Sequence, residues 1–267
     1  MNRKYSQALR YLFSRFVLRR RFLLGKEDEY GLQFKFKTED VVGRNIFKNG
    51  KYERDISEFI AKNIKFKSND IALDIGANIG WYSMLLNKLM PDTGRIFAFE
   101  PDPFNFSLLS ENILLNQANN VCAINKAVSD KREFKTLYLY SNRNLGRHSL
   151  LDINKGSGIR IETVQLDEFL QENNIDLSRV KFVKIDIEGY EFFALSGGEK
   201  VLNYVECLIC EFMPDTIKRG GLDPNHLIRL LEGKSFKPHV YKAGQLSSVR
   251  AADLLHKEEC DIIWLKD

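Results

Sequence analysis

One short stretch near residue 75 constrains the fold of this chain more than any other. Residues 71–75 form an apolar run that ends in a turn with two glycines, Gly76 and Gly80, and a helical pattern follows over 81–89. Because glycine has no Cβ, it tolerates tight turns and close approach of the backbone to a ligand. A strand, a glycine turn and a helix in this order are typical of an α/β sheet with a binding crevice beyond its strand ends.

The chain after residue 70 alternates apolar runs of strand length with helical patterns. We expect strands over 70–74, 95–99, 120–124, 181–185 and 206–212, and helices over 79–90, 104–116, 166–173 and 190–202. Two later apolar runs, 236–241 and 260–265, are typical of a terminal hairpin that adds an antiparallel edge. The pattern predicts an α/β fold with a mostly parallel sheet and helices on both faces.

Residues 1–53 differ in character from the rest. Residues 3–24 carry apolar side chains at helical spacing among arginines, which predicts a basic amphipathic helix. A hairpin or short strands are expected within 32–48, and a helix over 52–64. The predicted organisation is an N-terminal helix and cap segment, 1–53, followed by one α/β domain, 54–267. Three interpretations of the helix stay open: contact with an anionic membrane or acidic partner, a targeting segment, or packing on its own domain.

The distribution of charge argues against nucleic acid as a partner. The 267 residues include 40 basic and 36 acidic ones, a net charge of +4. Residues 1–24 hold seven of the basic residues and no acidic residue, which leaves 33 basic against 36 acidic residues elsewhere. Such a body lacks the broad basic surface of nucleic-acid-binding proteins. Since no apolar run reaches the roughly 18 residues of a spanning helix, we expect a cytoplasmic protein, with membrane association through residues 3–24 as the alternative.

Four sparse cysteines lie in apolar surroundings, which indicates reduced thiols: Cys122, Cys207, Cys210 and Cys260. Cys207 and Cys210 have the spacing of a redox or zinc pair. On a strand, however, two residues three positions apart point to opposite faces. We therefore expect packed thiols, and the sequence contains no visible cluster of histidine and cysteine ligands for a metal.

The glycine turn favours one cofactor over another. It reads Asp74-x-Gly76-x-Asn78-x-Gly80, whereas a dinucleotide loop has the spacing G-x-G-x-x-G. An acidic residue at this turn would repel a pyrophosphate, but it can pair with the ammonium group of a methionine moiety. Asn78 has donors for that moiety's carboxylate. The turn therefore predicts S-adenosylmethionine, held by Asp74, Gly76, Ala77, Asn78 and Gly80.

Polar residues also follow the next two strands, at the same edge of the predicted sheet. Glu100 lies 26 residues after Asp74, roughly the offset of a carboxylate that holds ribose hydroxyls. Asp102 follows it between two prolines that stiffen the loop. Ala127 belongs to a segment that could run along the adenine edge. We include Glu100, Asp102 and Ala127 among the candidate cofactor-binding residues.

Two candidate catalytic residues follow the fourth predicted strand, and a third lies in the connection between the third and fourth strands. A hydroxyl acceptor gains from a base that removes its proton. Asp186 is the first candidate because its strand end lies beside the expected methyl group, and it is also a candidate cofactor ligand. Glu188 and His148 are the alternatives. A divalent ion on Asp186 and Glu211 is a minor alternative, and we expect no metal.

Three motifs, at 74–80, 99–103 and 184–191, together resemble the FkbM family of S-adenosylmethionine-dependent methyltransferases. The resemblance covers roughly residues 50–215. It implies a class I methyltransferase (Rossmann-like) fold with seven strands, the last hairpin antiparallel, and O-methyl transfer to a hydroxyl of a carbohydrate, glycolipid or related small molecule. The alternatives are an NAD(P)-dependent reductase and a non-catalytic cofactor-binding module recruited to a membrane by its basic helix. The resemblance does not identify the acceptor, and the sequence does not reveal the oligomeric state.

Overall fold

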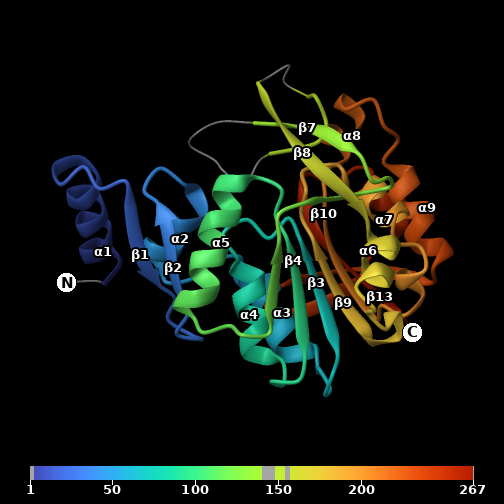
Figure 1. The fold of residues 1–267 in the computed structure, drawn as a ribbon, viewed down its shortest axis with the longest axis horizontal. Coiled ribbons are helices and arrows are strands. Elements are labelled where there is room, and N and C mark those ends of the chain that lie inside the picture. The colour runs from blue at the N-terminus through green and yellow to red at the C-terminus, as the bar shows by residue number, and fades with distance from the viewer. Residues whose placement is uncertain (1–2, 140–147, 154–156, 267) are drawn as a thin grey trace.

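The protein is described from a computed structural model, over residues 3–139, 148–153 and 157–266. Its core is an eight-stranded mixed sheet with the order β12-β11-β13-β10-β9-β3-β4-β5 (Figure 1). The parallel part consists of β5 Val121–Ile124, β4 Arg95–Phe99, β3 Ile71–Ile75, β9 Val180–Ile185 and β10 Cys207–Phe212. The antiparallel part consists of β13 Cys260–Lys266, β11 Phe236–Lys242 and β12 Gln245–Ser248.

Helices cover both faces of this sheet, as predicted (Figure 1). One face packs against α3 Arg54–Asn63, α4 Trp81–Leu89 and α5 Pro103–Leu115. The other packs against α6 Leu166–Glu172, α7 Glu191–Ser196, α8 Pro214–Arg219, α9 Asn225–Gly233 and α10 Ala251–Leu254. The central parallel strands β3, β4, β9 and β10 are mostly apolar because both of their faces are buried, whereas the edge strand β5 is only partly buried. That continuous burial is why their positions follow from the sequence.

The two paired cysteines confirm the prediction of packed thiols. Cys207 and Cys210 are both buried on β10, and they belong to the apolar clusters of opposite faces. Burial raises the pKa of both thiols above the usual value, which keeps them protonated. All four cysteines are free.

The edge of the sheet differs from the expectation of seven strands. An eighth strand, β12, pairs with β11, so β11 and β13 are not joined by a direct hairpin. All four residues of β12 are exposed, and it therefore lacks the apolar alternation that marks a strand in a sequence. The prediction that the last strands run antiparallel is confirmed.

A second, three-stranded sheet was missed by the sequence patterns. It consists of β6 Ala127–Ser129, β8 Gly158–Gln165 and β7 Phe134–Tyr138, with β8 in the middle. Figure 1 shows β7 and β8 together at one end of the main sheet, near α8. The segment that contains Ala127 is thus a strand of its own, and the sheet supplies one wall of the site described below.

The N-terminal segment is not one helix over 3–24, and that prediction is wrong. The observed elements are α1 Arg3–Leu12, a π-helical turn η1 Phe13–Val17, and β1 Phe22–Lys26 paired with β2 Gln33–Lys37. The burial of β1 alternates with period two, so its apolar residues fit a strand as well as a helical stripe. The expected hairpin over 32–48 is likewise only partly right, because α2 occupies Val41–Asn49.

Residues of the N-terminal segment share an apolar cluster with the main sheet. Tyr11, Phe36 and Ile46 belong to the same cluster as Trp81 of α4. The division into a cap, 1–53, and a methyltransferase domain, 54–267, stays a prediction. Within the part of the chain that the structure describes, no helix has the length and apolar character needed to cross a membrane.

Candidate active site

The glycine turn after β3 has the backbone conformation that its sequence predicts. Gly76, Asn78 and Gly80 have φ values of +85°, +50° and +94°, in the left-handed region that favours glycine and tolerates asparagine. A Cβ on Gly76 would lie 2.0 Å from the carbonyl oxygen of Asp186. Only glycine therefore lets the end of β3 pass this close to the loop after β9.

Glu100 anchors the turn from the end of the neighbouring strand. Its Oε2 accepts a hydrogen bond from the Asn78 N–H (2.8 Å), and its Oε1 accepts one from the Asp102 N–H (2.9 Å). These donors favour the carboxylate, but burial outweighs them and raises the pKa of Glu100 to about 8. Glu100 is therefore largely protonated near neutral pH until a ligand supplies further donors.

An apolar cleft of about 530 Å³ opens beside Glu100. Its walls come from the ends of β3, β4 and β9 and from strands β6 and β7 of the second sheet. The predicted site residues that line it are Gly76, Asn78, Glu100, Ala127, His148 and Asp186. Ile75, Phe99, Val128, Leu137 and Leu150 supply much of its apolar surface. A mostly apolar lining with a few polar groups suits a largely apolar ring system with a few polar anchors.

Four of the predicted cofactor ligands lie outside this cleft, and three of them are Asp74, Asp102 and Gly80. Asp74 is buried below the turn, accepts a hydrogen bond from the Ser83 hydroxyl, and has a pKa raised by burial to about 6. Asp102 caps α5, because its side chain accepts from the N–H groups of Phe104 and Asn105. Gly80 is the N-cap residue of α4. These three residues shape the loops, and their contact with a cofactor stays a prediction.

A second cavity, of about 840 Å³, adjoins the apolar cleft, and we call it the acidic cavity. The two spaces share Gly76, Asn78 and Asp186 as lining residues. The carboxylates that line the acidic cavity are Glu53, Asp186, Glu188, Glu211 and Glu259. Tyr52, Trp81 and Tyr82 add aromatic surface, and Ala77 lines this cavity rather than the cleft.

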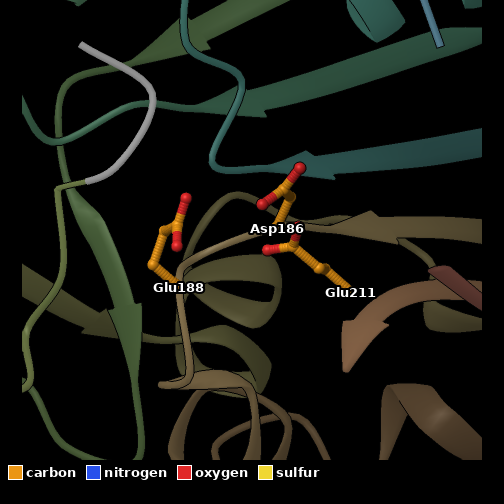
Figure 2. A group of neighbouring side chains, drawn as sticks. All are labelled: Asp186, Glu188 and Glu211. Carbon is orange, nitrogen blue, oxygen red and sulfur yellow. The ribbon is translucent and has the colours of Figure 1, made fainter. Parts of the chain in front are cut away.

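Three carboxylates meet where the two spaces join. One oxygen from each of Asp186, Glu188 and Glu211 lies within 4.8 Å of the others. Figure 2 shows Asp186 and Glu211 facing each other, with Glu188 on the loop that follows β9. Burial, Asp186 and Glu188 raise the pKa of Glu211 far above its usual range, so Glu211 carries a proton at neutral pH. The same three oxygens are the set that a divalent ion would use, and the expectation of no metal stays a prediction.

Lys184 and Glu191 hold the loop that carries Asp186, and neither role was predicted from the sequence. The fully buried Lys184 Nζ lies 3.4 Å from the Asp186 carboxylate and 3.1 Å from that of Asp261. The buried Glu191 carboxylate accepts hydrogen bonds from the N–H groups of Ile187 (3.1 Å) and Gly189 (3.2 Å). The position of Lys184 inside an apolar strand could have indicated this role, because a buried ammonium group requires a charged partner.

Glu53 was also missed, because it comes from the segment before α3. The Tyr82 hydroxyl donates a hydrogen bond to its carboxylate. Burial raises the pKa of Glu53 above its usual value, and the nearby Lys184 only partly offsets that effect. Glu53 therefore brings to the acidic cavity a carboxyl group whose pKa, at about 7, lies near neutral pH.

The three candidate bases lie at different places. His148 lines only the apolar cleft, and burial lowers its pKa, so its imidazole is neutral at pH 7. Glu188 lines only the acidic cavity, with a left-handed φ of +57°. Asp186 alone of the three lines both spaces. Asp186 is therefore the candidate positioned at the junction.

Comparisons with known proteins identify the family of this chain. The model of the methyltransferase FkbM domain matches residues 74–238, more than half of the chain. The hexuronic acid methyltransferase AglP of Haloferax volcanii is 22% identical over 223 residues, which cover 82% of this chain and 84% of that protein. The methyltransferase sdnD of Sordaria araneosa is 28% identical over 198 residues, which cover 63% and 74%.

The solved structures that resemble this fold include a methyltransferase FkbM from Methylobacillus flagellatus. It matches with a TM-score of 0.49 and 14% identity, over 97% of this chain and 60% of that chain. The match of the domain model, which includes the glycine turn, Glu100 and the loop of Asp186, is the finding that assigns the family. The chain belongs to the FkbM family of S-adenosylmethionine-dependent methyltransferases.

Proposed function

We propose that this enzyme binds S-adenosylmethionine in the apolar cleft and methylates a hydroxyl of a carbohydrate, glycolipid or related small molecule held in the acidic cavity. The observation that carries the proposal is the junction of these two spaces at Gly76, Asn78 and Asp186. When bound, the cofactor supplies a sulfonium methyl group with a good leaving group. The protein then needs to align the acceptor oxygen and exclude water.

The residues of the apolar cleft fit an adenosyl cofactor. Glu100 can accept hydrogen bonds from a ribose diol in addition to its two backbone donors. Among the described residues, the buried Oδ1 of Asn78 has no hydrogen-bond partner. An unpaired buried acceptor is costly, so a ligand ammonium group that donates to it would be stabilised. These groups support a cofactor with its sugar on Glu100 and its amino-acid end near the glycine turn. They do not favour a nicotinamide dinucleotide.

The acidic cavity supports an acceptor rich in hydroxyl groups. Carboxylates accept hydrogen bonds from hydroxyls, and the rings of Tyr52 and Tyr82 offer apolar faces. Its described lining contains five carboxyl groups, of which Glu211 holds a proton, and neither lysine nor arginine, so its charge is negative. This charge favours a neutral or cationic acceptor over an acidic one. The relative AglP is named for methylation of a hexuronic acid, which supports a sugar acceptor but not the same sugar.

Asp186 is the residue to which we assign the role of base. The acceptor hydroxyl would lose its proton to the Asp186 carboxylate while its oxygen bonds to the methyl carbon and the carbon–sulfur bond breaks. The contact with Lys184 and the close approach of Gly76 fix the position of Asp186. Glu188 on the acceptor side and the neutral His148 on the cofactor side remain the alternatives.

The experiment is a screen of nucleotide sugars, glycolipids and polyols with methyl-labelled S-adenosylmethionine. We expect label in a neutral or amine-bearing sugar, with the product stable as an ether. For Asp186→Asn we expect kcat to fall by about 10²- to 10⁴-fold, with affinity for S-adenosylhomocysteine nearly unchanged. His148→Asn and Glu188→Gln are the matched variants that test the two alternative bases in the same assay. Near wild-type turnover of Asp186→Asn at unchanged affinity would refute the assigned base, and label only on nitrogen or carbon would refute O-methylation.

A further inference from the structure

The N-terminal segment exposes an unusual amount of apolar surface. Of the large apolar residues that are exposed in the described chain, eight of thirteen lie between residues 9 and 24. We call them the N-terminal apolar patch: Leu9, Leu12, Phe13, Phe16, Val17, Leu18, Phe22 and Leu24. Phe16 and Val17 are 63% and 62% exposed. A concentration of exposed apolar side chains in one segment usually marks an interaction site.

The patch is not required to attach the segment to the domain. Tyr11 is 1% exposed, and its hydroxyl donates a hydrogen bond to the Thr38 carbonyl. The Tyr11 ring packs near Phe47, and Lys48 Nζ lies 4.6 Å from the ring centroid. The helix is therefore anchored by its inner side, and the apolar side chains on its outer side face solvent.

Arginines surround a hollow beside this patch. The basic hollow has a volume of about 960 Å³ and is lined by Arg15, Phe16, Arg19, Arg20, Arg21, Lys37, Thr38 and Glu39. The backbone fixes its rim, because the Arg20 N–H donates to Ser14 (3.0 Å) and the Thr38 N–H donates to the Arg21 carbonyl (2.8 Å). Lys37 pairs with Glu39, whereas no carboxylate among the described residues lies within ion-pair distance of the four arginines.

We propose that the N-terminal apolar patch and the basic hollow dock this enzyme onto an anionic phospholipid bilayer. The phenylalanines and leucines would enter the boundary of the acyl chains, while the arginines bind lipid phosphates. With ten residues in α1 and five in η1, the segment is too short to span a bilayer of roughly 20 helical residues, and it fits a position in the interface plane. Residues 25–267 carry a net charge of −3, so the excess positive charge of the chain lies in this segment.

Other occupants fit the observations less well. Nucleic acid would use the arginines but not the exposed leucines and valine. A second copy would bring its own seven basic residues against these, and like charges repel. A free phosphate would use the hollow and leave the patch in water. Only a bilayer surface has an apolar layer directly beneath a layer of phosphate.

The proposal is independent of the proposed reaction, but it bears on the acceptor. The segment packs against α2, and Val41 and Val42 at the start of α2 line the acidic cavity. Docking would therefore place the cavity close to a surface from which a lipid-linked acceptor could enter.

The test is flotation of the full-length protein with vesicles of phosphatidylcholine alone or mixed with phosphatidylglycerol. We expect binding to the mixed vesicles only, weakened by added salt. Arg20→Gln/Arg21→Gln should weaken binding about 30-fold, since each charge near such a surface contributes about 1 kcal/mol. Phe13→Ser/Phe16→Ser should weaken it by at least about tenfold. The controls, Lys65→Gln/Lys67→Gln and Leu114→Ser/Phe134→Ser, remove two positive charges or two exposed apolar side chains elsewhere and should bind like the wild type.

Several results would overturn the proposal. These are failure of the wild type to float, equal binding to both kinds of vesicle, and loss of binding in the control variants. Inorganic phosphate that binds the hollow as tightly as vesicles do would identify a free anion as the ligand. A dimer in light scattering that the Phe13→Ser/Phe16→Ser variant dissociates would identify a second copy. Circular dichroism and S-adenosylhomocysteine binding must match the wild type for each variant, and neither depends on membrane contact.

Discussion

Replacing Gly76 with alanine tests the closest backbone approach in the site. An alanine at φ +85° costs about 1–2 kcal/mol, because its Cβ approaches the following carbonyl. The new Cβ would also lie 2.0 Å from the Asp186 carbonyl oxygen and 2.9 Å from Ile187 Cγ2, both under the 3.0 Å that real Cβ contacts respect. The Asp186 oxygen belongs to the backbone and cannot rotate away, so the two loops must separate by about 1 Å. Forced overpacking of this kind costs about 1–3 kcal/mol.

The two costs together predict a loss of about 2–5 kcal/mol in the free energy of unfolding. Substitutions at two other glycines distinguish the cost of the backbone conformation from the cost of the close contact. Gly221 has a φ of +78° with nothing within 4 Å of its Cβ position, so Gly221→Ala should lose only about 1–2 kcal/mol. Gly233, at the end of α9, has open space and no left-handed φ, so Gly233→Ala should be neutral or gain up to about 1 kcal/mol.

Urea unfolding followed by tryptophan fluorescence measures these differences, because both tryptophans, Trp81 and Trp264, are buried. Gly76→Ala should also lower methyl transfer, since it displaces Asp186. A Gly76→Ala protein as stable as Gly221→Ala would refute the close approach to Asp186. One as stable as wild type would refute the left-handed turn as well.

Four further predictions concern charge and thiols. Binding of S-adenosylhomocysteine should release a proton near pH 7 and tighten from pH 6 to 8.5, because Glu100, with its pKa of about 8, must ionise to accept a diol; calorimetry in buffers of different ionisation enthalpy measures this, and Glu100→Gln should abolish it. Lys184→Met should lose about 3–5 kcal/mol in urea unfolding, since it leaves two carboxylates without their buried partner; wild-type stability would contradict the pairing. Native protein should react with a thiol reagent at the exposed Cys122 and not at Cys207 or Cys210; rapid labelling of either buried thiol would show that β10 opens. Methyl transfer should survive a chelator, whereas loss of activity restored by Mg²⁺ would establish the carboxylate cluster as a metal site.

The sequence predicts the centre of the sheet well because burial there is continuous. β3 is buried along its whole length, and the glycine turn after it has few conformational solutions. In β7 only Leu137 is buried while Phe134 is exposed, and all four residues of β12 are exposed, so neither strand has a clear alternation of apolar and polar residues in the sequence. The prediction of one N-terminal helix is wrong for a different reason. The apolar residues around Leu23 fit both the helical period and the strand period, and pairing with β2 selects the strand.

The site divides in the same way. Residues at strand ends, such as Glu100 and Asp186, follow from topology, because parallel strands end at one edge. Long-range partners do not: Lys184 meets Asp261 from 77 residues away, and Tyr82 reaches Glu53 across 29. A local pattern contains no information on such pairs. Asp74 and Asp102 show a second limit of sequence-based prediction. An acidic residue in a binding motif can form hydrogen bonds that stabilise the loop rather than contact a ligand.

A structure of the enzyme with S-adenosylhomocysteine tests the central claim most directly. We predict the adenine in the apolar cleft, the two ribose hydroxyls on the Glu100 carboxylate, and the sulfur directed at the junction by Asp186. A product bound elsewhere, or with its ribose turned away from Glu100, would contradict the account.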